Sequence, residues 1–334
     1  MQIVTHRLDT PYIIGPVYCY SLESMDGLIL VDCGAPTEEA KRYYLESFDL
    51  SRLRHILVTH GHSDHYGLAE WLSAKSGARI YFPYRDYLKI REQREYLRLM
   101  GDIVQGMGFS DFYYQRFLAV VTDPDFFAPL PQDIAVVERD FPNDLGLDFI
   151  DCPGHSQSDL VYLAGDCAMT GDTLLPGVFQ TPVLEVDMVH GGRFNNYEAY
   201  CASLVKLAAL EGRRILPGHG DAPVDIRQAQ LFYVRKLLRR AELLRPWRHE
   251  MNISHIMSEM FTGGMSEIFH VFLKACELLF IQDFFREPER LAVSLRQVGL
   301  YDQVEELYGR VLGRKAGDRE QVTGDRRQET GDNV

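Results

Sequence analysis

Four side chains that can bind metal ions stand within one six-residue stretch of the sequence. They are His60, His62, Asp64 and His65, and they follow directly after the apolar run His55–Thr59. Imidazole and carboxylate groups are ligands for zinc, iron and manganese. From an extended loop, His60 and His62 can reach one ion, while the next two ligands turn toward a neighbouring ion. The spacing predicts a metal site at the point where a strand passes into a helix.

Further ligands are expected downstream, because a two-metal site requires about four to six donors for each ion. Three candidates each follow an apolar segment and stand beside glycine: His155 in PGHS, Asp172 in TGDT and His219 in PGHG. The segments Ile56–Gly61 and Ile215–Gly220 are also similar, since they read ILVTHG and ILPGHG. This internal similarity suggests two related half-structures that meet at the metals.

The motifs THGHSDH, PGHS, TGDT and PGHG, in this order, resemble those of the metallo-β-lactamase-fold hydrolase superfamily, in its glyoxalase II-like branch. The run LILVDCG at 28–34 resembles the family's early strand, which ends in aspartate. The resemblance covers about residues 1–222, apart from an inserted segment. It implies an α/β fold, a four-layer α/β/β/α sandwich with the metals at one edge.

The resemblance also implies a role for each candidate ligand. The first metal would be held by three histidines: His60, His62 and His155. The second metal would be held by Asp64, His65 and His219. Asp172 would bridge the two ions, and Asp32 would orient the ligands through hydrogen bonds, as partners behind metal ligands do.

The implied cofactor is a pair of divalent metal ions, with zinc expected first and iron or manganese as alternatives. Two cations about 3.5–4 Å apart lower the pKa of a shared water, and the resulting hydroxide attacks a carbonyl or phosphoryl centre. Asp64 is the expected catalytic residue, since it can accept or relay a proton while it holds its metal. Position 172 is aspartate where the antibiotic-degrading members commonly have cysteine, which argues against a true β-lactamase.

Three substrate signatures of the superfamily do not match this sequence. The glutathione-thioester hydrolases have a Gly-Cys-Gly-Arg-like stretch soon after the bridging aspartate, where this chain reads TGDTLLPGVFQT. The quorum-signal lactonases have a tyrosine there, where this chain has Leu174 and Leu175. The second histidine motif of the tRNA-processing ribonucleases is not found. These differences leave the substrate open within the family.

The leading hypothesis is a hydrolase of a small ester, thioester or lactone with an apolar acyl part. A second hypothesis is a phosphodiesterase or ribonuclease that uses the same two metals, which a basic run between Arg235 and Arg248 favours and the net charge of −13 opposes. A third is a mononuclear iron enzyme that oxidises sulfur, or a regulatory protein with vestigial activity. A complete set of seven ligands disfavours the third, because a single iron would leave ligands unused.

The chain divides into a catalytic region over 1–222, a helical C-terminal region over 223–313 and a polar tail over 314–334 that we expect to be disordered. Within the first region, residues 84–131 form a helical insertion with many aromatic residues. The insertion is either a lid that walls an apolar substrate pocket or a packed segment with its own core or homodimer contact. Both roles can hold at once.

Local patterning predicts the elements around the motifs. Helices are expected near 37–47, over 67–75 and over 196–210, and the segment 134–140 has the pattern of a strand. Between Asp172 and the third helix lies an irregular loop with two polar candidates for substrate binding, His190 and Arg193. Arg193 could bind an anionic group of the substrate and His190 could be an extra ligand; the alternative for both is an ordinary surface residue.

Composition agrees with a cytoplasmic enzyme. Of 334 residues 46% are hydrophobic and 25% are charged, which suffices for a buried core. Six dispersed cysteines favour reduced thiols. The N-terminus has no signal-peptide pattern and no apolar stretch reaches the length of a membrane span. The expected partner is therefore a small-molecule substrate, with neither membrane nor nucleic acid, and a homodimer through the insertion is possible.

Overall fold

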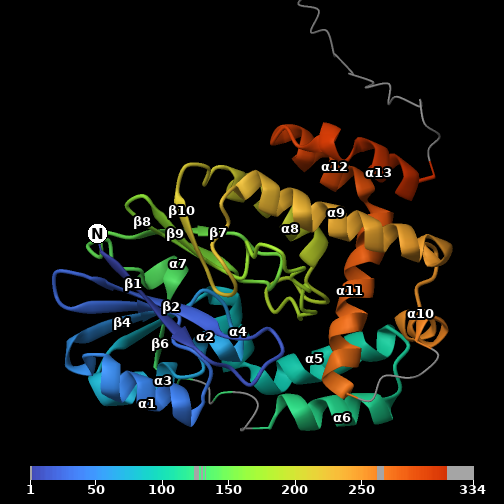
Figure 1. The fold of residues 1–334 in the computed structure, drawn as a ribbon. Coiled ribbons are helices and arrows are strands. Elements are labelled where there is room, and N and C mark those ends of the chain that lie inside the picture. The colour runs from blue at the N-terminus through green and yellow to red at the C-terminus, as the bar shows by residue number, and fades with distance from the viewer. Residues whose placement is uncertain (1, 124–127, 129–130, 132, 262–266, 314–334) are drawn as a thin grey trace, which may run out of the picture.

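The computed structural model describes most of the chain, namely residues 2–123, 128, 131, 133–261 and 267–313. Two β-sheets lie face to face with helices on their outer faces, and a group of long helices stands at one end of this sandwich (Figure 1). The predicted four-layer α/β fold is confirmed. The predicted disordered tail lies outside the described residues.

The first sheet contains six strands in the order of the chain, within the part that the structure describes. Its strands are β1 (Ile3–Leu8), β2 (Val17–Glu23), β3 (Leu28–Val31), β4 (Leu53–Leu57), β5 (Arg79–Phe82) and β6 (Ile134–Val136). The first three strands pair antiparallel, and β3 to β6 pair parallel. Since parallel strands end at the same edge, β3 and β4 bring Asp32 and the His60 turn to one place.

The second sheet has the order β10-β9-β8-β7 in the described residues. Its strands are β7 (Asp148–Asp151), β8 (Leu160–Ala164), β9 (Cys167–Gly171) and β10 (Arg214–Pro217). Strands β9 and β10 are parallel, so Asp172 and His219 leave the sheet at the same edge. At that edge the two sheets are joined, because the Tyr18 amide donates to the Gly218 carbonyl oxygen at 2.7 Å.

Alternating side chains of the strands form the layers of the sandwich. Residues such as Ile29 and Leu57 of the first sheet pack against Tyr162 and Met169 of the second. The neighbouring residues on the same strands face outward, against α1 (Glu38–Ser47) and α3 (Ala69–Ser76). Helices α8 (Asn196–Ala208) and α9 (Ile226–Leu244) cover the second sheet. Each fully buried aliphatic side chain contributes about 1.5–3 kcal/mol to this packing.

The insertion and the C-terminal region form one group of helices. The insertion contains α4 (Tyr84–Arg91), α5 (Gln93–Gly106) and α6 (Asp111–Val121). The C-terminal helices after α9 are α10 (Ile253–Met260), α11 (Ile268–Arg286), α12 (Pro288–Gln297) and α13 (Glu305–Val311). Buried residues of α5 and α6 share a hydrophobic core with α8, α9 and α11. In Figure 1, α5 and α6 lie beside the lower end of α11.

Short elements complete the described chain. They are η1 (Leu50–Arg52), α2 (Ser63–Tyr66), α7 (Val137–Asp140), η2 (Arg245–Trp247) and η3 (Tyr301–Gln303). The strand expected over 134–140 is too long, because β6 ends at Val136 and the chain turns into α7. The Asp140 carboxylate accepts a hydrogen bond from the Val136 amide at 2.8 Å, which closes this turn.

Candidate metal centre

Three histidine rings converge at the first part of the site. Nε2 of His60 lies 2.9 Å from Nδ1 of His62, and Nε2 of His155 lies 3.1 Å from the same Nδ1 atom. The first two residues belong to the turn between β4 and α2, and His155 belongs to the loop between β7 and β8. Segments from the two sheets therefore supply one group of nitrogen donors. We call these three histidines, His60, His62 and His155, the first group.

A second group lies beside the first. It consists of Asp64, His65 and His219. Asp64 and His65 lie on α2, whereas His219 follows β10. Nε2 of His219 is 3.3 Å from Oδ2 of Asp64, and all three side chains are buried. Like the first group, it joins residues that are distant in the sequence.

The carboxylate of Asp172 faces both groups. Its Oδ1 atom lies 3.4 Å from Nε2 of His65 and 3.6 Å from Nε2 of His219. Its Oδ2 atom lies 3.7 Å from Nε2 of His155. The seven candidate ligands from the motifs thus meet at one edge of the sandwich, with Asp172 between the two groups.

The donor atoms of this cluster fit divalent cations. The Nε2 atoms of His65 and His219 and Oδ1 of Asp172 are buried and have no hydrogen-bond partner. Such atoms cost free energy when they stay unpaired. In the first group a neutral imidazole has only one donor and one acceptor nitrogen, so three nitrogens aimed at one point cannot all satisfy one another. A cation in each group would satisfy these atoms with ligand types that zinc, iron and manganese accept.

Hydrogen bonds behind the ligands fix the orientation of the rings. Nδ1 of His65 lies 2.7 Å from Oδ2 of Asp32, and Nδ1 of His219 lies 2.8 Å from the carbonyl oxygen of Pro16. The Thr59 amide and hydroxyl donate to the same Asp32 carboxylate at 2.8 and 2.9 Å. Because the Nδ1 atoms of His65 and His219 are held in this way, their Nε2 atoms face the centre.

Burial and neighbouring charges set the protonation of the ligands. Burial, together with the adjacent histidines, holds the pKa of His60 and His62 well below the usual range. Burial would raise the pKa of the Asp172 carboxyl, but His219 and His65 outweigh it and hold that pKa well below its ordinary value. Neutral imidazoles in the first group and an ionised carboxylate between the groups are the forms that bind cations.

Close backbone packing explains the glycine of the PGHG motif. A Cβ atom at Gly218 would lie 2.6 Å from Oδ1 of Asp172 and 2.8 Å from Cε1 of His65. Real side chains do not approach so closely, so any larger residue would displace one of these two ligands. Gly218 is therefore required by the site and not only by the turn.

Several residues near the centre carry no motif in the sequence. Asp86 is fully buried, and burial followed by the nearby Glu185 carboxylate raises the pKa of its carboxyl to about 7. Lys89 forms an ion pair of 2.7 Å with Glu185. Tyr12 contacts Ser63 beside Asp64, and burial raises the pKa of its phenol to about 12. The only sequence signal for Asp86 and Lys89 is their spacing of three on a helix.

The two polar candidates of the loop after Asp172 each form an ion pair with an aspartate. Nδ1 of His190 lies 3.0 Å from Oδ2 of Asp187, and the His190 side chain is 71% exposed. Arg193 forms an ion pair of 2.8 Å with Asp283 on α11. Neither residue belongs to a candidate metal group among the described residues. The ion pair with Asp283 ties the loop to the C-terminal helices.

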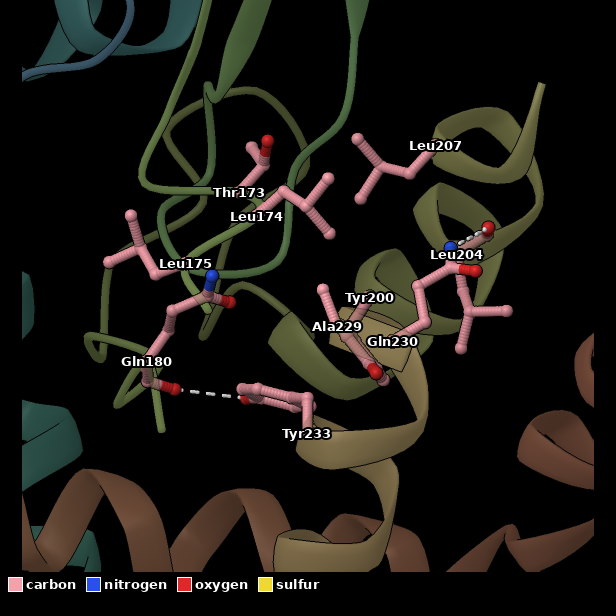
Figure 2. Close-up of a pocket in the computed structure, with 10 residues that line it drawn as sticks. All are labelled: Thr173, Leu174, Leu175, Gln180, Tyr200, Leu204, Leu207, Ala229, Gln230 and Tyr233. Atoms are coloured by element: carbon pink, nitrogen blue, oxygen red, sulfur yellow. Dashed lines mark hydrogen bonds between the residues drawn. The ribbon is translucent and has the colours of Figure 1, made fainter. Parts of the chain in front are cut away.

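A small cavity begins at Thr173, the residue that follows Asp172 in the sequence (Figure 2). It is lined by the loop that follows Asp172 and by α8 and α9: Thr173, Leu174, Leu175, Gln180, Tyr200, Leu204, Leu207, Ala229, Gln230 and Tyr233. The Tyr233 hydroxyl donates to the Gln180 carbonyl oxygen at 2.9 Å. The cavity has a volume of about 10 Å³, enough for about one water molecule. It is therefore too small for an acyl chain.

Comparison with known proteins identifies the family. The model of the metallo-beta-lactamase superfamily matches residues 12–219. The chain belongs to the metallo-beta-lactamase superfamily. This confirms the assignment made from the motifs, and the members of the superfamily generally bind divalent metals. The match spans both groups of ligands, from the loop before β2 to His219.

Two curated relatives in the superfamily come from Bacillus subtilis strain 168. The probable metallo-hydrolase YqjP is 25% identical over 247 residues, which are 68% of this chain and 74% of the relative. The probable metallo-hydrolase YflN is 26% identical over 231 residues, 62% of this chain and 81% of the relative. These relatives confirm the prediction that the chain is a metallo-hydrolase of this superfamily.

Solved structures show the same fold. A metallo-beta-lactamase family protein from Thermus thermophilus matches with a TM-score of 0.64 and 21% identity, over 86% of this chain and 94% of that chain. A beta-lactamase domain protein from Burkholderia ambifaria matches with a TM-score of 0.66 and 18% identity, over 85% and 86%. Both matches cover more than the superfamily region. Among the described residues, no helix has the length and apolar character of a membrane span.

Proposed function

We propose that this superfamily member is a hydrolase that uses two divalent cations to cleave a small ester, thioester or lactone. The observation that carries the proposal is the position of Asp172, whose two oxygen atoms face two different groups of ligand atoms. A site for one ion would need only one of these groups. Relatives named as probable metallo-hydrolases support the reaction class.

The ligand residues have distinct tasks in this proposal. The first group would hold one cation and the second group would hold the other. Asp172 would contribute a ligand to both cations. Zinc is the expected metal, with iron or manganese as alternatives. When bound, two such cations supply a nucleophilic hydroxide near neutral pH and polarise the oxygen of the substrate. The Asp64 carboxylate, buried beside His219, would accept or relay a proton.

An apolar acyl part of the substrate is supported by the loop between β1 and β2. Tyr12 in this loop contacts Ser63, the neighbour of Asp64. The next residue, Ile13, is 81% exposed, and Ile14 is partly exposed. Exposed aliphatic side chains on a loop that reaches the candidate metal centre through Tyr12 and Pro16 would offer an apolar surface to a substrate. The aromatic residues of the insertion contribute less than expected, because many of them pack against the C-terminal helices.

The contacts of the basic run do not favour a phosphodiesterase or ribonuclease. Arg240 forms an ion pair of 2.9 Å with Glu277 on α11. Arg245 donates to the carbonyl oxygen of Arg310 at 3.2 Å. These arginines therefore take part in packing α9 against other C-terminal helices. With a net charge of −13, the chain would also repel a nucleic acid unless a local basic patch acted against it.

A substrate panel tests the proposal. The chain loaded with zinc would be assayed on thioesters and lactones with short and long acyl groups, and on bis(p-nitrophenyl) phosphate and single-stranded RNA. We expect carbonyl substrates to be cleaved, with turnover lost in Asp64→Asn. Unchanged turnover in that variant would reject the proposed role of Asp64. Cleavage of the phosphate substrates alone would instead support the second hypothesis, and one iron per chain without a second ion would revive the third.

A further inference from the structure

The first helix of the insertion contacts the turn that carries two ligands of the first group. The side chain of Asp86 on α4 is fully buried. Its Oδ2 atom accepts a hydrogen bond of 2.7 Å from the amide of Gly61, the residue between His60 and His62. A Cβ atom at Gly61 would lie 2.7 Å from Cγ of Asp86, so the carboxylate packs directly on this peptide. Asp86 therefore fixes the backbone between the two histidines.

One helical turn later, the same helix reaches the loop of the third ligand. Nζ of Lys89 lies 2.7 Å from Oε1 of Glu185. The other oxygen of this carboxylate, Oε2, accepts a hydrogen bond of 2.7 Å from the amide of Gln157, two residues after His155. Glu185 is only 1% exposed, so little water competes for these contacts. The loop has a further contact with α4, because the Asp86 amide donates to the hydroxyl oxygen of Ser158 at 3.2 Å.

The second group is held by other parts of the chain. His65 is oriented by Asp32 at the end of β3, and His219 by the carbonyl oxygen of Pro16 before β2. These partners belong to the first sheet and its loops, not to the insertion. Nδ1 of His60 also lies 3.1 Å from the Thr59 hydroxyl oxygen, which is bonded to Asp32. The two groups therefore share this support, and the contacts of the Gly61 amide and the His155 loop with the insertion are specific to the first group.

We propose that α4 of the insertion positions the first group, with Asp86 holding the His60–His62 turn and the Lys89–Glu185 pair holding the His155 loop. The inference rests on the proposed function only in that the first group binds a cation. Asp86 and Lys89 are positioning residues, since they act through the peptides on either side of the ligands. Their loss should weaken cation binding at the first group and leave the second group largely unchanged.

Calorimetric titration with Zn²⁺ after chelation tests this selectivity on the full chain. Two control variants assign the binding events. His62→Ala should remove the Zn²⁺ binding event of the first group, and His219→Ala should remove that of the second group. We expect Asp86→Ala to weaken the event of the first group about 10–100-fold. Asp86→Asn keeps an acceptor oxygen for the Gly61 amide and should recover part of the loss. Arg91→Ala, an exposed position on the same helix, is the matched control and should leave both events unchanged.

Hydrogen exchange of the metal-free protein gives a second measurement that needs neither cation nor substrate. Peptides over 59–66 should exchange faster in Asp86→Ala, and peptides over 153–159 faster in the double variant Lys89→Met with Glu185→Gln. Should Asp86→Ala fail to fold, Asp86→Asn and the double variant decide the question.

Wild-type affinities with unchanged exchange would overturn the inference. Equal weakening of both events in a variant with a native circular dichroism spectrum would overturn it as well, since that result indicates general loosening. A wild-type chain that binds cations but cleaves no substrate would count against the proposed function alone. A single binding event in the wild type would reject the two-cation centre, and the exchange rates would still decide the role of α4.

Discussion

At the scale of single residues, the centre depends on strained and crowded backbone positions. Asp32 has a φ of +55°, a left-handed conformation that residues other than glycine rarely adopt. Its carboxylate accepts two hydrogen bonds from Thr59 and is 2.7 Å from Nδ1 of His65, so these contacts offset the strain. Strain of this kind is concentrated at functional sites. The unfavourable backbone conformation of Asp32 is therefore linked to the orientation of the His65 ring.

Gly218 gives a prediction at this scale. In Gly218→Ala the new methyl group would collide with Asp172 and His65. We expect cation affinity to fall about 10–100-fold, as for other changes that misplace ligands. Gly106→Ala is the control, because a Cβ atom there meets nothing within 4 Å and alanine favours a helix. Zinc titration of both variants checks this. Equal zinc affinities in the two variants would show that the backbone at residue 218 can shift without displacing Asp172 or His65.

The sequence predicts the candidate ligands and Asp32, but not the other residues that hold them. The ligands have fixed chemistry and stand in short motifs, and the structure brings the seven residues from these motifs to one edge of the sandwich. Asp86, Lys89 and Glu185 are ordinary charged residues in helix and loop, and their contacts depend on how the insertion returns to the sheet. Asp32 was found only because the family resemblance includes its strand.

At the scale of elements, the sequence showed which segments are helical but not their partners. An amphipathic helix needs an apolar neighbour, and its pattern does not say which one. The aromatic residues of the insertion illustrate this, because Phe117 on α6 packs against Phe272 on α11 with ring centroids 4.4 Å apart. Segments far apart along the sequence thus share one core. The end of β6 could not be predicted either, since Val137 continues the apolar pattern into a helical turn.

This shared core predicts the effect of truncating Phe272, which is 3% exposed. Phe272→Ala should lower the free energy of unfolding by about 3–5 kcal/mol, because it leaves a cavity in a dense aromatic contact. Urea denaturation followed by circular dichroism measures the change. Val293→Ala, at a side chain that is 58% exposed on α12, is the control and should have little effect. A small change at Phe272 would mean that the insertion and α11 are only loosely packed.

At the scale of the whole molecule, the candidate metal centre combines residues from both sheets. The His60–His65 turn follows a strand of the first sheet, whereas His155, Asp172 and His219 follow or precede strands of the second. Bound cations would therefore link the halves of the sandwich as well as take part in chemistry. The similarity between ILVTHG and ILPGHG agrees with this arrangement, because both segments end at the same edge.

Removal of the cations should therefore destabilise the entire fold and not only abolish activity. A ligand that binds only the folded chain stabilises it by about 2.7 kcal/mol when present at about one hundred times its Kd. We expect a higher melting temperature with added zinc than with a chelator, and a smaller difference in Asp172→Ala, which removes the carboxylate between the groups. Asp144→Ala, at an exposed aspartate, should keep the full difference. Equal melting temperatures in zinc and chelator would mean that the folded chain does not hold cations between its sheets, because any such binding must appear as added stability.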